Sequence, residues 1–276
     1  TPLEEEQLEK INTKLDELLG DERFQLEDMM NEDIEKLFQQ SEDLLTSKLS
    51  TKQKKSLEDL NQQLSSLFEK KNIDDKIMMK LCQEFYHEKT LNRIKAFQDS
   101  NPNYNYPKKV NGVKVVSLPN LIGKINWDVL YEGIPRFIHG DLNFGNIIYN
   151  KELGKFILVD WREDFAGEIE FGDLYYDIAK LYAGILLNYD YVKKGLFKVV
   201  QETDELNIDF KVIDNSSKYV EILEGFIESN GMQKKKVLLL VGLIYINMAP
   251  LHHPPFNFLL IGLGTKILND TMSISD

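Results

Sequence analysis

Three side chains that carry oxygen ligands lie next to short apolar segments between residues 137 and 161. Asp141 comes shortly after the apolar pair Phe137–Ile138, Asn146 follows five residues later, and Asp160 directly follows the apolar run Phe156–Val159. Carboxylate and amide oxygens are ligands that Mg²⁺ takes in proteins. A further carboxylate beside such a metal could act as the base that orients a hydroxyl group for attack. Phosphoryl transfer needs mainly such an oriented nucleophile and neutralisation of the phosphate charge. The pattern therefore indicates a magnesium-dependent phosphoryl-transfer site.

A predicted hairpin would bring these side chains together. A buried strand ends at His139, and the loop after it presents Asp141. A second apolar strand, a turn at 150–154 and a third strand then form a hairpin, with Asn146 just before it and Asp160 just after it. We expect these two residues at neighbouring strand ends. An Asp alone in a loop is usually a cap or a turn residue, so the interpretation depends on the joint pattern.

The run His139–Leu142, followed by Asn146, resembles the catalytic loop of the aminoglycoside phosphotransferase and choline kinase family, which is related to the protein kinases. The sequence Val159–Trp161 is similar to the metal-binding Asp motif of that family. The resemblance implies that Asp141 is the catalytic base. It also implies that Asn146 and Asp160 are ligands of Mg²⁺ and, through the metal, help to bind ATP.

A third match lies at Gly172–Leu181, which resembles the helix that follows the metal motif in this family. The resemblance implies that Asp177 braces the backbone of the catalytic loop. Physical chemistry agrees, because an Asp inside an otherwise apolar helix needs buried donors to offset its desolvation. We expect His139 to support the loop as a buried, hydrogen-bonded side chain. Arg162 either meets a phosphate or an acidic substrate or forms a surface ion pair with a neighbouring carboxylate.

Charge and composition restrict the class of protein. The 276 residues include 45 Asp and Glu against 33 Lys and Arg, which gives a net charge of −12. This acidity disfavours a partner such as nucleic acid or an anionic membrane, which needs a basic surface. No apolar run reaches the ~18 residues of a membrane span, and the acidic start has no signal-peptide character. The single cysteine, Cys82, excludes an internal disulfide and favours a reducing compartment, so we expect a cytoplasmic protein.

Two regions of the chain differ in charge and in helix-breaking residues. Residues 1–75 carry 20 acidic and 10 basic side chains, and the chain between Leu3 and Asn101 has no proline and one glycine. Apolar residues at helical spacing predict helices throughout this part, the last of them from about 74 to 97. We therefore expect an acidic helical region at 1–75 and a kinase-like catalytic lobe at 76–276, in a mostly helical α+β fold.

The strands of the catalytic lobe are expected in one small sheet around residues 109–160. There, Asn111-Gly112 suits the type I′ turn of a short hairpin. Beyond Asp173 the sequence predicts helices alone, among them an apolar helix at Val237–Ala249.

The resemblance leaves the nucleotide side of the site unexplained. A kinase also has an N-terminal sheet lobe, with a glycine-rich loop over the phosphates and a strand Lys paired to a helix Glu. Residues 1–108 contain one glycine and no strand pattern. Three explanations stay open: the nucleotide lobe is missing or supplied by a partner chain, the helical region replaces it, or the protein is a kinase-like scaffold.

Two functions from different classes are consistent with these observations. The primary hypothesis is ATP- and Mg²⁺-dependent phosphorylation of a hydroxyl on a small molecule, such as a sugar, an amino alcohol or an aminoglycoside-like acceptor. The alternative is a non-catalytic kinase-like interaction module, or a fragment that lacks its nucleotide lobe.

Overall fold

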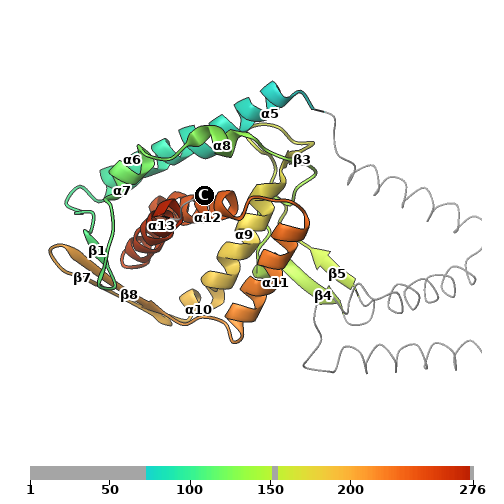
Figure 1. The fold of residues 1–276 in the computed structure, drawn as a ribbon. Coiled ribbons are helices and arrows are strands. Elements are labelled where there is room, and N and C mark those ends of the chain that lie inside the picture. The colour runs from blue at the N-terminus through green and yellow to red at the C-terminus, as the bar shows by residue number, and fades with distance from the viewer. Residues whose placement is uncertain (1–72, 151–154, 274–276) are drawn as a thin grey trace, which may run out of the picture. The chain divides into compact units, whose positions relative to one another are not determined.

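The computed structural model of the chain describes residues 73–150 and 155–273. The predicted acidic helical region, 1–75, lies outside the described residues apart from its last three. The described part is a mostly helical α+β fold with small sheets, as expected (Figure 1). No helix in these ranges is both long and apolar enough to span a membrane.

The first described helix runs without a break through three segments: α5 (Asp75–Cys82), a π-helical turn η1 (Gln83–Glu88) and α6 (Lys89–Ser100). The Asp74 side chain accepts a hydrogen bond from the backbone N–H of Lys76 and so caps the start. One face of the helix is buried, through Met78, Cys82, Phe85, Tyr86, Ile94 and Phe97. The predicted helix at about 74–97 is therefore confirmed.

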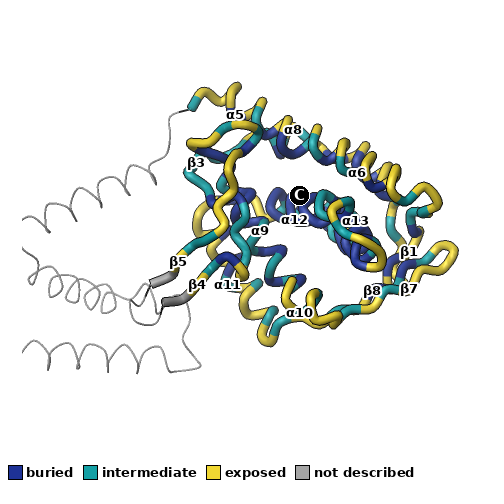
Figure 2. Tube along the Cα trace, turned by 180° about the vertical axis from the view of Figure 1, so that it is seen from behind, coloured by how far each residue is buried: buried dark blue, intermediate teal, exposed yellow. Residues whose placement is uncertain are grey.

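The core is built around α12 (Lys234–Met248), which packs against α9 (Leu174–Leu186) and α13 (Phe256–Ser273). A helix that is apolar on every side is expected to be buried, and α12 is dark over most of its length in Figure 2. Helices α12 and α13 cross at Gly242 and Gly264, where a Cβ added to Gly264 would lie 2.8 Å from the Gly242 carbonyl oxygen. The predicted apolar helix at 237–249 is confirmed.

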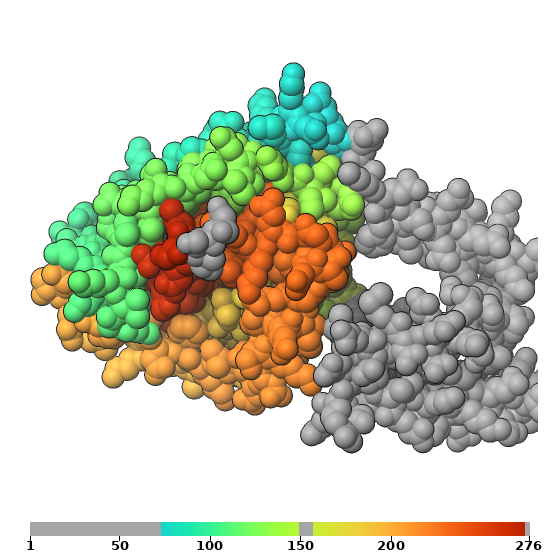
Figure 3. All heavy atoms as spheres, viewed as in Figure 1, coloured from blue at the N-terminus to red at the C-terminus, as the bar shows by residue number. Residues whose placement is uncertain are grey.

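Further helices surround this core. In Figure 3, α13 (red) lies between the segment that carries α7 and α8 (green) and helix α11 (orange). These surrounding elements are α7 (Leu118–Ile122), α8 (Trp127–Tyr131), α10 (Tyr189–Lys193), α11 (Ser216–Ser229) and the 3₁₀ turns η2 (Phe144–Asn146) and η3 (Ala249–Leu251).

The expected single sheet at 109–160 is wrong, because the strands form three separate sheets. The hairpin of β1 (Lys109–Val110) and β2 (Val113–Lys114) has both turn residues in the left-handed region, with φ of 49° at Asn111 and 77° at Gly112. This hairpin was predicted. Its β1 edge, however, pairs with β8 (Glu205–Phe210) and not with the strands near the site. The four-stranded sheet has the order β2-β1-β8-β7, in which β7 is Phe197–Gln201.

The prediction of helices alone beyond residue 173 is also wrong. Strands β7 (Phe197–Gln201) and β8 (Glu205–Phe210) form an antiparallel hairpin there. The buried positions in β8 are Leu206 and Ile208, and polar residues alternate with them. A period of two is typical of a strand with one buried face, so a local signal for this hairpin was present in the sequence.

Two small sheets frame the site. Strand β4 (Ile147–Asn150) pairs antiparallel with β5 (Lys155–Leu158), as predicted. Strand β3 (Pro135–Arg136) pairs with β6 (Gly172–Asp173), so it ends earlier than the strand expected to run to His139.

The start of α9 is fixed by the buried carboxylate of Asp173. It accepts hydrogen bonds from the Tyr86 hydroxyl (2.8 Å) and from the backbone N–H groups of Ile134 (2.8 Å) and Tyr175 (3.1 Å). The buried Lys236 ammonium lies 3.9 Å from the same carboxylate. These partners join α9 to the first helix and to α12, and α9 carries two residues of the site.

Candidate functional site

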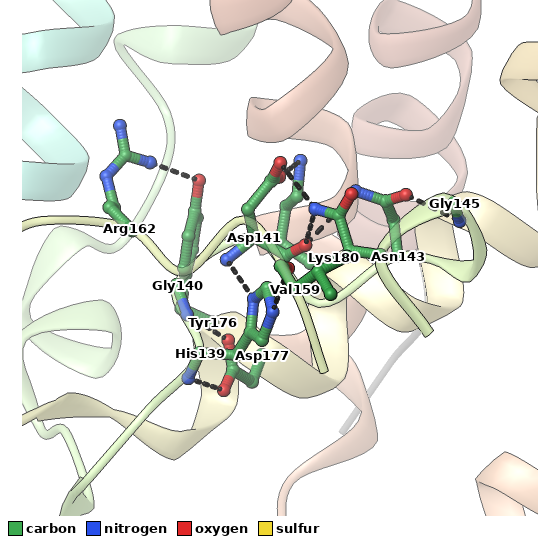
Figure 4. Close-up of polar contacts among 11 residues, drawn as sticks. His139, Gly140, Asp141, Asn143, Gly145, Val159, Arg162, Tyr176, Asp177 and Lys180 are labelled. Carbon is green, nitrogen blue, oxygen red and sulfur yellow. Dashed lines mark hydrogen bonds and ion pairs between the residues drawn. The ribbon is translucent and has the colours of Figure 1, made fainter. Parts of the chain in front are cut away.

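A buried carboxylate holds the 139–146 loop in place. Asp177, on α9 and only 6% exposed, accepts hydrogen bonds from the backbone N–H groups of His139 (2.6 Å) and Gly140 (2.8 Å), as Figure 4 shows. Burial raises the pKa of Asp177, and the two N–H donors oppose that shift. The contacts expected of a bracing residue are therefore present.

Gly140 allows this close fit. Its φ is +75°, a conformation that glycine adopts without strain. A Cβ at this position would also lie 2.5 Å from the Cβ of Arg162. The loop therefore lies directly against the chain that follows β5, where the backbone N–H of Arg162 donates to the His139 carbonyl (2.9 Å).

The His139 side chain links the loop to the end of β5. Its Nε2 lies 2.8 Å from the Val159 carbonyl oxygen, and its Nδ1 accepts from the backbone N–H of Asp141 (3.2 Å). Because Nε2 faces a carbonyl oxygen and Nδ1 faces an N–H donor, the ring fits these partners as the neutral tautomer with its proton on Nε2. With 2% exposure, His139 supports the loop as predicted, and neither nitrogen is left for a substrate.

The β4–β5 hairpin places Asn146 and Asp160 at neighbouring ends, as predicted. Ile147 is paired with Leu158, and the backbone N–H of Val159 donates to the Asn146 carbonyl (3.0 Å). Asp160 is exposed and has a φ of +57°, which is uncommon for any residue with a Cβ. Backbone strain of this kind often occurs at functional sites.

Asn146 also contacts Asp141 directly. The buried amide donates through its Nδ2 to the Asp141 carbonyl (3.0 Å) and to the Asp141 carboxylate (3.2 Å). Since both hydrogen bonds use Nδ2, the Oδ1 atom is the one that could meet a cation. All three residues predicted to carry the chemistry therefore line one pocket of about 480 Å³.

An ion pair that the sequence analysis missed joins Lys180 to Asp141. The Lys180 ammonium lies 2.5 Å from the Asp141 carboxylate (Figure 4). Burial by itself would raise the pKa of Asp141, but Lys180 and the Asn146 amide outweigh it and hold that pKa below its usual value. Asp141 is therefore a charged acceptor at neutral pH. The available signal was the spacing: Lys180 lies three residues after Asp177, on the same side of α9.

A second pocket, of about 340 Å³, adjoins the first and shares Asp141, Asp160 and Lys180 with it. We call the first the amide pocket, because Asn143, Asn146 and Asn188 line it. We call the second the cation pocket, because Lys89, Arg93 and Arg162 line it beside Lys180. The sequence analysis gave no role to Lys89 or Arg93, although their spacing of four residues places both on one side of α6.

Arg162 does not form the expected surface ion pair with a carboxylate among the described residues. Its guanidinium lies 3.5 Å from the Tyr176 hydroxyl and 5.1 Å from the centre of the Phe85 ring. It therefore stays available at the mouth of the cation pocket.

The donor set for a metal is small. Within the described ranges, no group of three or more His, Cys, Asp or Glu side chains is arranged to hold a metal ion. The predicted Mg²⁺ ligands are one carboxylate, Asp160, and one amide, Asn146, next to the charged Asp141. Mg²⁺ commonly takes one or two carboxylates and completes its shell with water and substrate phosphates, so this set fits a metal that arrives with a nucleotide.

Comparison with known proteins gave no match to a family model, to a curated protein or to a solved structure. The resemblance at residues 139–181 therefore rests on those residues alone.

Proposed function

We propose that this protein is an ATP- and Mg²⁺-dependent phosphotransferase that acts on a hydroxyl of a small molecule. The observation that carries the proposal is the charged Asp141, fixed on a loop that Asp177 and His139 support, beside Asn146 and Asp160 in one pocket. A sugar, an amino alcohol or an aminoglycoside-like compound would be the acceptor.

In this proposal Asp141 is the base. Its carboxylate accepts the proton of the acceptor hydroxyl while the hydroxyl oxygen attacks the γ-phosphorus of ATP, the bond to the bridging oxygen breaks, and ADP leaves with that oxygen. The pKa of Asp141, held below its usual value, keeps the carboxylate ionised. Mg²⁺ bound by Asn146 and Asp160 would neutralise phosphate charge. The Lys180 ammonium, which forms an ion pair with the Asp141 carboxylate, would stabilise the negative charge of the transferred phosphoryl group.

An exposed apolar face lies next to this pocket. Ile148 and Ile157 are directly opposite each other in the β4–β5 hairpin, so they lie on the same face of it, and they are 49% and 41% exposed. Phe144 precedes β4 and Trp161 follows β5, so both flank the open end of the hairpin, and both are also exposed. Such a face would suit the base of a nucleotide, or a lobe that closes over it.

The same face favours the second candidate function, a non-catalytic interaction module. An apolar face of this kind often marks a site of protein association. A module has no use for the charged set at Asp141 and Asp160, which supports the enzyme as the first candidate. A fragment whose nucleotide lobe is supplied elsewhere would combine both features.

The test is nucleotide binding followed by an acceptor screen. Calorimetry of the full chain with ATP, with and without Mg²⁺, should show binding that depends on the metal. A panel of hydroxyl compounds is then screened for ADP release by the wild type and by two variants, Asp141→Asn and the control Asp209→Asn. Asp209 is exposed on β8, so its loss removes the same charge away from the pocket. Absence of metal-dependent ATP binding would favour the module.

A further inference from the structure

The cation pocket contains more positive than negative side chains. Four cations line it, from α6, from α9 and from the segment after β5: Lys89, Arg93, Arg162 and Lys180. Two carboxylates line it, Asp141 and Asp160. Of the four cations, Lys180 alone forms an ion pair with a carboxylate in the described part of the chain. The pocket therefore has unneutralised positive charge beside the proposed base.

The free cations are close to one another. Lys89 lies with its ammonium 3.9 Å from the centre of the Phe85 ring, and the Arg162 guanidinium lies 5.1 Å from the same ring. Burial, which has the largest effect, and the charges of Arg162, Arg93 and Lys180 together lower the pKa of Lys89 to about 7. Like charges held together at short range are unfavourable, and an anion placed among them would relieve that repulsion.

The carboxylates on the outer side of the cluster do not neutralise it. A shallow hollow next to the cation pocket is lined by Lys89, Arg93 and Arg162 together with the acidic residues Glu84, Glu88 and Asp164. Asp164 raises the pKa of Lys89, but its effect is smaller than those of burial and the neighbouring cations, which lower that pKa. The Asp164 carboxylate accepts a hydrogen bond from the backbone N–H of Gly167 (2.7 Å). No ion pair joins these acids to the three cations within the described residues.

A buried polar atom in the same pocket also has no partner. The side chain of Asn247 lines the pocket and donates through Nδ2 to the Thr90 hydroxyl (3.1 Å). Its Oδ1 is buried and makes no hydrogen bond in the described structure. Buried polar atoms in folded proteins are nearly always paired. The wall of the cation pocket therefore includes a residue with an unused hydrogen-bond acceptor.

The two pockets differ in which predicted metal ligands line them. Asn146 lines the amide pocket but not the cation pocket, whereas Asp160 lines both. In Figure 4, Arg162 and Asn143 lie to opposite sides of Asp141. In-line phosphoryl transfer places the nucleophile and the leaving group at opposite ends of the transferred phosphoryl group, so the side away from Asn146 is where the acceptor would lie.

We propose that Lys89, Arg93 and Arg162 bind an oxyanion, a phosphate or a carboxylate group carried by the acceptor. Arginine suits such groups because its planar fork donates two parallel hydrogen bonds. The assignment of the oxyanion to the acceptor rests on the proposed function, whereas the oxyanion site itself does not. The substrate class is then a hydroxyl compound with an acid group, which disfavours a polycationic acceptor such as an aminoglycoside.

The site is tested by titrating sulfate into the full chain and following binding by calorimetry. Arg93→Gln and Lys89→Gln should each weaken sulfate binding by about tenfold or more, which is typical for the loss of one charged hydrogen bond. Lys198→Gln is the matched control, because Lys198 is exposed on β7, and it should bind sulfate as the wild type does. Melting curves of all variants check the fold, and Arg93→Lys should restore part of the affinity. Sulfate binding that is absent, or unchanged in both variants, would overturn the site.

Two further titrations identify the source of the oxyanion. Glycerol 3-phosphate should bind to the wild type and weaken with Arg93→Gln, whereas glycerol should not bind. ATP with Mg²⁺ should bind Arg93→Gln as tightly as the wild type; an equal loss would show that the cluster serves the nucleotide phosphates and would overturn the acceptor assignment. Arg93-dependent sulfate binding in a chain that does not bind ATP would refute the proposed phosphotransferase and leave the oxyanion site standing.

Discussion

Replacing Asp177 by Ala should destabilise the fold around the 139–146 loop. Asp177 is the acceptor for two backbone donors, the N–H groups of His139 and Gly140, at 2.6 and 2.8 Å. Its side chain and both donors are buried. Alanine leaves the two N–H groups without an acceptor in a place that water reaches poorly.

The size of the effect follows from the two stranded donors. A buried donor left unsatisfied costs about 1–3 kcal/mol. Two such donors would lower the free energy of unfolding by about 2–6 kcal/mol, and removal of a carboxylate whose pKa burial has raised offsets part of this. We therefore expect the lower half of that range. Since about 1 kcal/mol moves Tm by about 2–4 °C in a domain of this size, Tm should fall by at least about 4 °C.

The assay is thermal unfolding of wild type, Asp177→Ala, Asp177→Asn and the exposed control Asp209→Ala. Asp177→Asn should lie between wild type and Asp177→Ala, because an amide oxygen accepts one N–H while its own NH₂ group faces the other. Hydrogen exchange should also become faster at the N–H groups of His139 and Gly140. A Tm for Asp177→Ala equal to that of the control, with unchanged exchange, would refute the bracing role.

The remaining predictions concern the chemistry. Asp141→Asn should keep the fold but lower turnover by about 10²–10⁴-fold, the usual effect of losing a general base; wild-type turnover on a known acceptor would contradict the assignment. Asp160→Ala should weaken ATP binding in the presence of Mg²⁺ more than acceptor binding, as separate titrations would show. Sulfate binding should be tighter near pH 6 than near pH 8.5, because Lys89, with a pKa of about 7, loses its positive charge as the pH rises. Lys89→Gln should remove that pH dependence.

Lys89 also makes the free energy of unfolding depend on pH. The lowered pKa of Lys89 determines whether that free energy rises or falls with pH. The folded chain binds this proton more weakly than the unfolded chain, whose Lys keeps the ordinary value of 10.5. Between about 7 and 10.5 the unfolded state therefore holds more protons, so stability rises with pH over that window. Comparison of Tm against pH for wild type and Lys89→Gln isolates this contribution. Wild type should show the steeper rise.

Local sequence patterns were enough to predict the parts of the site that lie within one element or one hairpin. An apolar strand, a turn and a second apolar strand fixed the β4–β5 hairpin, and that pairing sets Asn146 and Asp160 at neighbouring ends whatever the rest of the chain does. Asp177 is a single carboxylate in an otherwise apolar helix, and this predicts that buried hydrogen-bond donors surround it. The left-handed turn at Asn111-Gly112 followed from residue type. Each of these inferences concerns residues within one element or one hairpin.

Which distant side chains come into contact depends on how the helices and sheets pack together. The ion pair of Lys180 with Asp141 depends on how α9 packs beneath the loop, and the cation pocket depends on how α6 and α9 each pack against α12. Periodicity predicts that a helix has a buried face, but it does not say which other element covers that face or which charged residues come to border it. Likewise, the pairing of β1 with β8 joins residues almost a hundred positions apart. Such contacts are set by the packing of the whole core, which no short stretch of sequence encodes.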